Sequence, residues 1–146
     1  MTGSQTPRTA PAEGGTATAP ATASATTSAV DVALSYHRAW TSGDLNAAMR
    51  WVAADVAFDS PAGPLAGAAA LREYMEPFAR SLDSSSLIAA QGTEDEALLL
   101  YDTASRVVAS APAAEWYRVA QGRITAGRIV FDRLPFALAR GDVVPR

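Results

Sequence analysis

A glutamate in a mostly apolar strand is the side chain of this sequence best suited to acid chemistry. Residues 106–120 read as a long strand, whose two-residue alternation puts Glu115 and Tyr117 on one side and Trp116 on the other. If Glu115 faces a dry interior, burial raises the pKa of its carboxyl, and the neutral acid can donate a hydrogen bond to a ligand oxygen. The alternative is an ion pair with an arginine on the same sheet, for which the candidates are Arg106, Arg118 and Arg128.

Two further titratable side chains are candidates for a catalytic role. His37 is the only histidine, and it lies in a predicted helix where it can act as a general base or simply pack at the edge of the core. Asp59 ends a short predicted strand just before a Pro-Ala-Gly-Pro turn. Alternation predicts that Asp59 points away from the interior, so it takes part in chemistry only if a bulge turns it inward. Otherwise it is a turn or capping residue.

Composition argues against several other kinds of site. The absence of cysteine excludes disulfides and thiol catalysis, and a single histidine argues against a zinc site. The acidic run Glu94-Asp95-Glu96 reads as a solvated turn rather than a metal site. A net charge of −3 without a basic cluster argues against nucleic acid as a partner. Because no stretch resembles a signal peptide or a membrane span, we expect a cytoplasmic protein with no cofactor, no metal and no membrane partner.

The two ends of the chain differ from its middle. Residues 1–28 contain no aromatic and no branched aliphatic side chain and are rich in Ala, Thr and Pro. Such a segment cannot bury enough apolar surface to offset the entropy of ordering it, so we predict a disordered tail. We expect one folded domain over residues 29–137 and a flexible C-terminal tail over residues 138–146.

The first half of the domain carries helix signals. Ser28 has the position of a helix cap, Gly43 ends that helix, and Asp44 caps a second, shorter one. Gly67 opens a third helix, which Pro77 should bend or interrupt.

The second half carries strand signals. One short strand starts near residue 55, and four longer ones follow the third helix, over residues 84–91, 94–103, 106–120 and 123–132. This order predicts an α+β fold, in which three N-terminal helices pack on a curved, mostly antiparallel sheet and enclose an apolar pocket. The side chains that we expect on the pocket wall are Trp40, Phe58, Ser60, Tyr74, Phe78 and Tyr117.

Three motifs stand at the ends of the predicted elements. They are Tyr-x-x-Ala-Trp-x-x-Gly-Asp-Leu from Tyr36, Asp-Val-x-Phe-x-x-Pro-x-Gly from Asp55, and Glu-Trp-Tyr-Arg-Val-x-x-Gly-Arg-Ile from Glu115. Together with the order of elements, they resemble the NTF2-like superfamily over about residues 30–136, and its SnoaL-like members in particular. The resemblance implies a cone-shaped α+β fold. It does not fix the chemistry, because that superfamily includes polyketide cyclases, ketosteroid isomerase, epoxide hydrolases and dehydratases.

The resemblance also implies roles for individual positions. Compared with ketosteroid isomerase, Tyr36 matches the pocket tyrosine and Glu115 the protonated acid, whereas Ser60 stands in place of the general base. Compared with limonene-epoxide hydrolase, Tyr101-Asp102-Thr103 replaces the catalytic Arg-x-Asp pair, so that activity is not expected. The polyketide cyclases use an acid in their pocket, and Glu115 is the acid available for that role here.

Two hypotheses follow for the function. The first is a pocket protein that binds a small hydrophobic molecule, with a carbonyl group held by Glu115 and Tyr36. The second is a cofactor-free enzyme, a cyclase, isomerase or dehydratase-like lyase acting on a polyketide- or steroid-like substrate. They differ in whether a base faces Glu115 across the cavity. In either case we expect a homodimer formed through the sheet face that bears Trp116, because a Trp on a sheet face without helices is typical of an interface.

Overall fold

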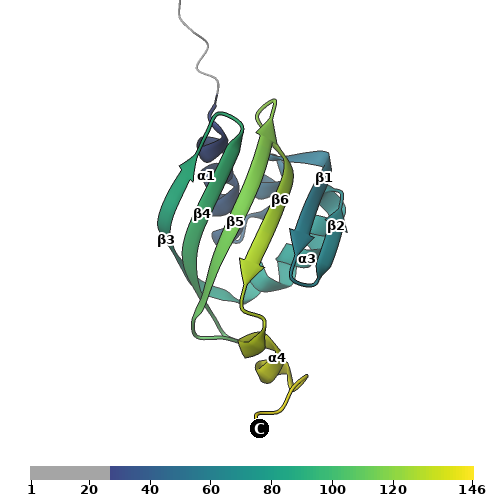
Figure 1. The fold of residues 1–146 in the computed structure, drawn as a ribbon, viewed down its shortest axis with the longest axis vertical. Helices are drawn as coiled ribbons and strands as arrows, with labels where there is room; N and C mark the ends of the chain where they lie inside the picture. The colour runs from purple at the N-terminus through teal and green to yellow at the C-terminus, as the bar shows by residue number, and fades with distance from the viewer. Residues whose placement is uncertain (1–26) are drawn as a thin grey trace, which may run out of the picture.

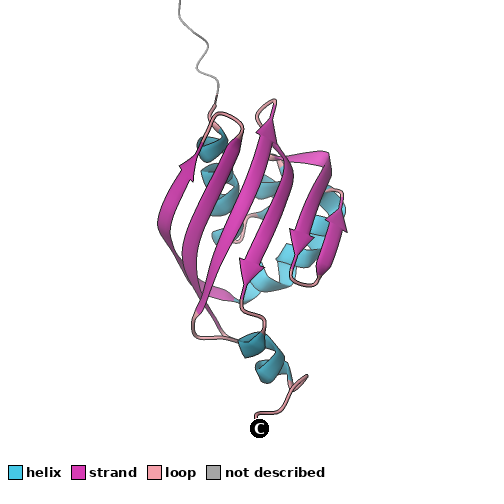
Figure 2. Cartoon of the chain, in the orientation of Figure 1, coloured by secondary structure: helices cyan, strands magenta, loops and turns pink. Residues whose placement is uncertain are grey.

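A computed structural model describes residues 27–146 as a curved sheet with helices on one face (Figures 1 and 2). The prediction of a disordered tail falls almost wholly on residues outside this range. The elements in chain order are α1 (Ala29–Thr41), α2 (Leu45–Met49), β1 (Val52–Ser60), β2 (Gly63–Ala66), α3 (Ala68–Ser81), β3 (Leu82–Gly92), β4 (Glu96–Ser105), β5 (Ala111–Ala120), β6 (Arg123–Phe131) and α4 (Leu134–Arg140).

Local signals account for the N-terminal helices. The Ser28 hydroxyl oxygen accepts a hydrogen bond from the backbone N–H of Asp31 at 3.2 Å and caps α1. The Asp44 carboxylate caps α2 in the same way, accepting from the N–H of Ala47 at 2.9 Å. Between the two helices, Gly43 has a φ of +86°, in the left-handed region that glycine tolerates. Helix α3 runs through Pro77 without interruption.

The sheet has the strand order β2-β1-β6-β5-β4-β3. All neighbouring pairs are antiparallel except β1 and β6, which are parallel. Helices α1 and α3 lie behind the sheet in Figure 1, and its other face carries no helix. The predicted α+β class, with helices on a curved and mostly antiparallel sheet, is therefore confirmed.

Two elements differ from the sequence prediction. Residues 61–64 were expected to be a turn that leads to the helix at Gly67, but residues 63–66 form β2, which pairs with the end of β1 through Ser60↔Gly63 and Phe58↔Leu65. Pro64 is tolerated there because β2 is an edge strand. The chain end was expected to be loose from residue 138, but helix α4 continues to Arg140. The structure thus has a fourth helix beside the three that were predicted.

Aromatic side chains fill the core between α1 and the sheet. Tyr36 and Trp40 of α1 are fully buried, and the Tyr36 ring meets that of Tyr117 edge-on, with 5.8 Å between centroids. Phe58 of β1 packs where β6 has Gly127. A Cβ atom at that position would lie 2.2 Å from the Phe58 ring, so the close approach of this ring requires glycine.

The helix-free face of the sheet carries an apolar patch. Its members are Leu98, Leu100, Trp116 and Val130, hereafter the outer patch. Register places Leu98 beside Trp116, and Leu100 and Val130 lie on either side of Ala114. Leu98 and Val130 are 50% and 57% exposed, so this apolar surface faces solvent in the single chain.

Candidate functional site

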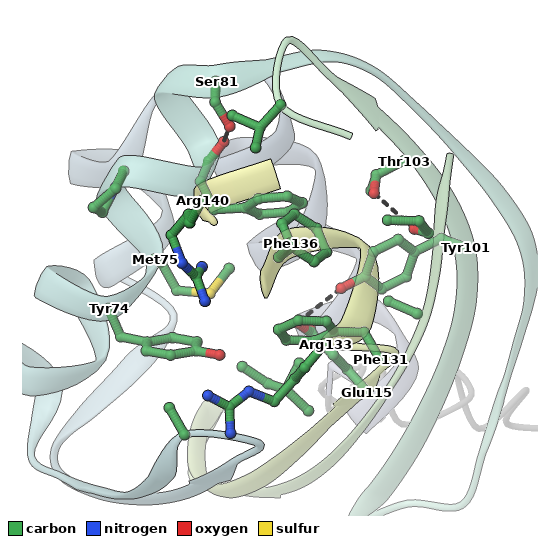
Figure 3. Close-up of a pocket in the computed structure, with 17 residues that line it drawn as sticks. Tyr74, Met75, Ser81, Tyr101, Thr103, Glu115, Phe131, Arg133, Phe136 and Arg140 are labelled. Carbon is green, nitrogen blue, oxygen red and sulfur yellow. Dashed lines mark hydrogen bonds between the residues drawn. The ribbon is translucent and has the colours of Figure 1, made fainter. Parts of the chain in front are cut away.

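A cavity of about 400 Å³ opens between α3, the concave face of β4–β6, and α4. Most of its wall is apolar, including Met75 and Phe78 from α3 and Ile129 and Phe131 from β6. Its size and lining are typical of a pocket for a small organic ligand. The polar side chains on the wall are Tyr74, Ser81, Tyr101, Thr103, Glu115, Arg133 and Arg140 (Figure 3).

Glu115 is the acid of this cavity and is 1% exposed. Its Oε1 accepts a hydrogen bond of 2.9 Å from the hydroxyl of Tyr101 (Figure 3). Its Oε2 is buried and has no hydrogen-bond partner among the described residues. Burial raises the pKa of Glu115 from its usual 4.5 to about 7, although the hydrogen bond from Tyr101 acts in the opposite direction. The carboxyl is therefore close to half protonated at neutral pH.

The alternative of an ion pair does not hold for Glu115, because each candidate arginine has another partner. Arg118 pairs with Glu96 at 2.9 Å, and Arg128 pairs with Asp59 at 2.8 Å. Arg106 donates to the backbone carbonyl of Arg80.

Tyr101 is the site residue that sequence reasoning missed. It was considered only as the first residue of Tyr101-Asp102-Thr103, which stands in place of an Arg-x-Asp pair. In the sheet, Leu99 is directly opposite Glu115, and Tyr101 lies two residues further along the same face. The two side chains can therefore meet diagonally across the strands. Alternation gave the face of each residue, but the register between β4 and β5 was needed to bring them together.

Tyr36 lies in the core next to the Glu115 side chain and is not on the cavity wall. Its hydroxyl has no hydrogen-bond partner among the described residues. Burial, and then the charge of Glu115, raise the pKa of Tyr36 well above its usual value, so its hydroxyl stays protonated. Tyr36 thus belongs to the surroundings of the acid, and the donor that contacts Glu115 is Tyr101.

His37 is separated from the cavity by a layer of side chains. Its ring packs against that of Tyr101, with 4.5 Å between centroids, and meets Trp40 edge-on. Burial, and then the neighbouring Arg38, lower the pKa of His37 to about 4. The imidazole is neutral at pH 7 and contacts the wall residue Tyr101 without lining the cavity itself, which fits packing at the edge of the core, the second of the two roles considered for His37.

Asp59 and Ser60 end β1, the strand next to the edge strand β2, and both line a shallow groove outside the cavity. The Ser60 side chain also acts on the wall residue Tyr74, where its hydrogen bond lowers the pKa that burial raises. Asp59 is exposed and bound to Arg128, as alternation predicts for a strand without a local bulge. The Ser60 hydroxyl donates to the backbone carbonyl of Gly63 in the β1–β2 turn. Neither residue is among those that line the cavity, so Asp59 points away from it, as alternation favours, and Ser60, which stands in place of the general base, lies beside the wall residue Tyr74.

The predicted wall residues divide into two groups. Tyr74 and Phe78 of α3 line the cavity, as expected. Trp40, Phe58 and Tyr117 are core residues beneath it and do not reach its surface. The sequence could not separate the two groups because periodicity on helices and strands marks only the inward face, and the depth of packing on that face distinguishes wall from core.

The segment around α4 supplies wall residues that no sequence argument suggested. Phe136 packs edge-on against Phe78 and Phe131, with centroids 6.1 and 5.4 Å away. Arg133 and Arg140 reach over the cavity from the ends of the helix (Figure 3). Pro135 near the start of α4 and left-handed Gly141 after its end were available signals for this helix.

No group of three or more His, Cys, Asp or Glu side chains within residues 27–146 could hold a metal ion. No helix in the same range is long and apolar enough to cross a membrane.

The protein thus has an α+β fold, with helices on a curved sheet and a buried acid on the wall of its cavity, and known proteins share this fold. The family model of the SnoaL-like domain matches residues 33–127. A protein from Kribbella flavida DSM 17836 is 51% identical over 80% of this chain and 96% of its own, with a TM-score of 0.77. The chain belongs to the SnoaL-like domain family.

More distant structures show the same fold. A putative polyketide cyclase from Sinorhizobium meliloti is 17% identical over 68% of this chain and 94% of its own, with a TM-score of 0.61. A protein with a ketosteroid isomerase-like fold from Catenulispora acidiphila DSM 44928, solved with trimethylamine, is 16% identical over 79% of this chain and 98% of its own, with a TM-score of 0.62. No curated protein sequence matches the chain.

Proposed function

We propose that the protein binds a small apolar molecule in this cavity and holds a carbonyl oxygen of that molecule with the protonated carboxyl of Glu115. One observation carries the proposal. Glu115 is a fully buried acid on the wall of an apolar cavity, with one oxygen bonded to Tyr101 and the other without a partner among the described residues. Buried polar atoms without partners are rare in folded proteins, and a bound ligand is one explanation for them.

The hydrogen bond from Tyr101 determines where the acid proton lies. Because the Tyr101 hydroxyl donates to Oε1, the proton of neutral Glu115 belongs on Oε2. The charge of Glu115 and this hydrogen bond also raise the pKa of Tyr101, after the larger effect of burial, so the tyrosine remains a donor. The pair therefore presents one O–H donor to a ligand, and an ionised Glu115 would present none.

A pair of matched neutral compounds tests this proposal. 2-Acetylnaphthalene carries a carbonyl group, and 2-isopropylnaphthalene has nearly the same shape without it. We expect the ketone to bind the wild type about ten-fold more tightly below pH 7, as one net hydrogen bond provides, when the two are compared by calorimetry or thermal shift. This preference should fade as the pH rises through about 7, because the donor is lost when Glu115 ionises.

Two variants at Glu115 complete the test. Glu115→Gln keeps a donor at all pH values, so its preference for the ketone should persist and no longer depend on pH. Glu115→Ala should bind both compounds equally. A ketone preference that survives in Glu115→Ala would contradict the proposal.

A catalytic role is the second candidate, and the pKa of Glu115 favours it. A general acid is most effective when its pKa lies near the working pH, and that of Glu115 is about 7. The other titratable groups on the described wall are Tyr74, Tyr101 and two arginines, none of which is a ready base at pH 7. An aldol-type ring closure of a substrate that is already in its enol form fits this set. The enol carbon bonds to the carbonyl carbon, Glu115 gives its proton to the carbonyl oxygen, and the enol O–H proton returns to the Glu115 carboxylate, so no separate carbon base is needed.

Turnover assays on any ketone that binds would distinguish the two roles. If Glu115 transfers a proton, kcat/KM should change with pH around 7, and Glu115→Gln should abolish turnover while it retains binding. A binding protein would show no turnover in either form.

A further inference from the structure

The two ends of the cavity differ in charge. Glu115 and Tyr101 form one polar pair, on the right in Figure 3. The guanidinium groups of Arg133 and Arg140 lie on the opposite side, toward Tyr74 of α3. The Arg133 charge acts to lower the pKa of Tyr74, which burial raises, and this places Arg133 near the Tyr74 hydroxyl. The Glu115 charge acts on the same tyrosine and raises its pKa, so Tyr74 lies within reach of both ends of the cavity.

Arg133 is held over the cavity by an uncharged partner. Its Nη1 donates to the backbone carbonyl of Pro61 at 2.8 Å. Within residues 27–146 no carboxylate oxygen lies within salt-bridge distance of its guanidinium group. The nearest acid in sequence, Asp132, accepts instead from the backbone N–H of Leu134 at the start of α4. The positive charge of Arg133 is therefore not neutralised by the chain around it.

Arg140 is the second cation of this end and is partly neutralised. Its Nε donates to Asp142 at 2.8 Å, and both side chains are about half exposed. An ion pair of that kind is weak and leaves the arginine able to contact a ligand. The charged groups on the described wall are thus one acid at the inner end and two arginines at the other, in a chain whose net charge is −3.

We propose that the ligand of this cavity is an amphipathic organic anion, with its apolar body against the aromatic wall and its anionic group bound by Arg133, with Arg140 beside it. The inference rests on the proposed function, because it concerns the same cavity, and it names the second recognition element of the ligand. A planar guanidinium binds carboxylate or sulfonate oxygens through charge-assisted hydrogen bonds, and it loses less hydration than an ammonium group would. Phe136 and Phe131 hold the segment that carries Arg133 in place.

A matched pair of fluorescent dyes isolates the anionic group. 1-Anilinonaphthalene-8-sulfonate and N-phenyl-1-naphthylamine share one apolar body, and only the first carries a sulfonate. We expect the wild-type protein to bind the sulfonate about ten-fold more tightly, as charge-assisted hydrogen bonds provide. Raising the salt concentration from about 0.05 M to about 0.5 M should lower the affinity of the protein for the sulfonate dye and leave its affinity for the neutral dye unchanged.

Three variants locate the effect. Arg133→Gln should remove most of the preference for the sulfonate, and Arg133→Lys should restore part of it. Arg123→Gln is the matched control, because it makes the same change of charge at the other end of β6, away from the cavity. It should leave both affinities unchanged. The neutral dye also controls for folding. If a substitution displaced or unfolded α4, the affinity for both dyes would fall together.

The outcomes separate this inference from the proposed function. If both dyes bind the wild type with equal affinity, or if Arg123→Gln weakens the sulfonate dye as much as Arg133→Gln does, the anionic ligand is refuted and the acid–carbonyl proposal stands. If neither dye binds the wild type, the cavity is not a ligand site and both proposals fail.

Discussion

Replacing Glu115 with glutamine should change how the stability of the protein depends on pH. In the folded state the pKa of Glu115 is raised from 4.5 to about 7. Between these values the folded state binds one proton more than the unfolded state does, so stability falls as pH rises. At about 1.4 kcal/mol per pH unit, the loss amounts to about 3 kcal/mol, complete above pH 7 and absent below 4.5. Glutamine does not titrate and removes this loss.

The titration of His37 changes the stability of the protein with pH in the opposite direction. Its pKa is lowered from 6.5 to about 4, so the unfolded state binds the extra proton between those values and stability rises with pH. In the wild type the two slopes oppose each other between about pH 4.5 and 6.5, and the net profile there should be nearly flat. In Glu115→Gln only the His37 slope remains, so the stability of the variant should increase over this range by about 3 kcal/mol.

Urea unfolding followed by tryptophan fluorescence measures this effect, with buried Trp40 as a reporter. The quantity to compare is the difference in unfolding free energy between variant and wild type, at several values from pH 4.5 to pH 8. Glu73→Gln, at an exposed position on α3, makes the same chemical change and should show no such trend. A difference that does not vary with pH would refute the account of Glu115. A glutamine variant that becomes relatively less stable as pH rises would instead indicate an ion-paired carboxylate.

Further predictions concern the partner of the acid, the assembly and the N-terminus. Tyr101→Phe removes the hydrogen bond that lowers the pKa of Glu115, so the carboxyl should titrate at a higher pH than in the wild type, and an unchanged or lower midpoint would contradict this role. We propose that the outer patch forms a homodimer contact; light scattering should then give twice the chain mass, and Trp116→Arg should give the monomer. A wild type that is monomeric at high micromolar concentration would contradict this proposal. Deleting residues 1–26 should leave the melting temperature unchanged, and a fall of many degrees would show that this segment packs on the domain. Ser28→Ala should lower the free energy of unfolding by about 1 kcal/mol, because it removes the hydrogen bond that caps α1.

The fold could be predicted from the sequence because its signals are local. Caps at Ser28 and Asp44 mark the first two helices, and two-residue alternation marks the long strands. Strand β2 could not be predicted, because Gly-Pro-Leu-Ala has low strand propensity and forms a strand only through pairing with β1. Helix α4 has a proline and a glycine at its ends, but its seven residues have no buried face to show a helical period.

The site was only partly predictable, because it depends on the register between strands and on how deeply each side chain packs below the cavity wall. Alternation put Glu115 on the inner face, and the structure buries it there. Its partner Tyr101 depends on how β4 is aligned with β5, which no local pattern determines. Tyr36 was assigned to the pocket through resemblance alone, and its ring packs one layer below the cavity wall. Arg133 was missed because its position depends on the path of the chain after β6.

Carbonyl binding by this protein requires that Glu115 is a buried acid that is still protonated near neutral pH. Carbon-13 NMR of glutamate labelled at the side-chain carboxyl measures the protonation of Glu115 directly, and the Glu115→Gln spectrum assigns the signal. We expect a titration midpoint near pH 7 for the wild-type protein without ligand. A midpoint at or below 4.5, the usual value for a glutamate, would contradict both the buried acid and the carbonyl-binding role built on it.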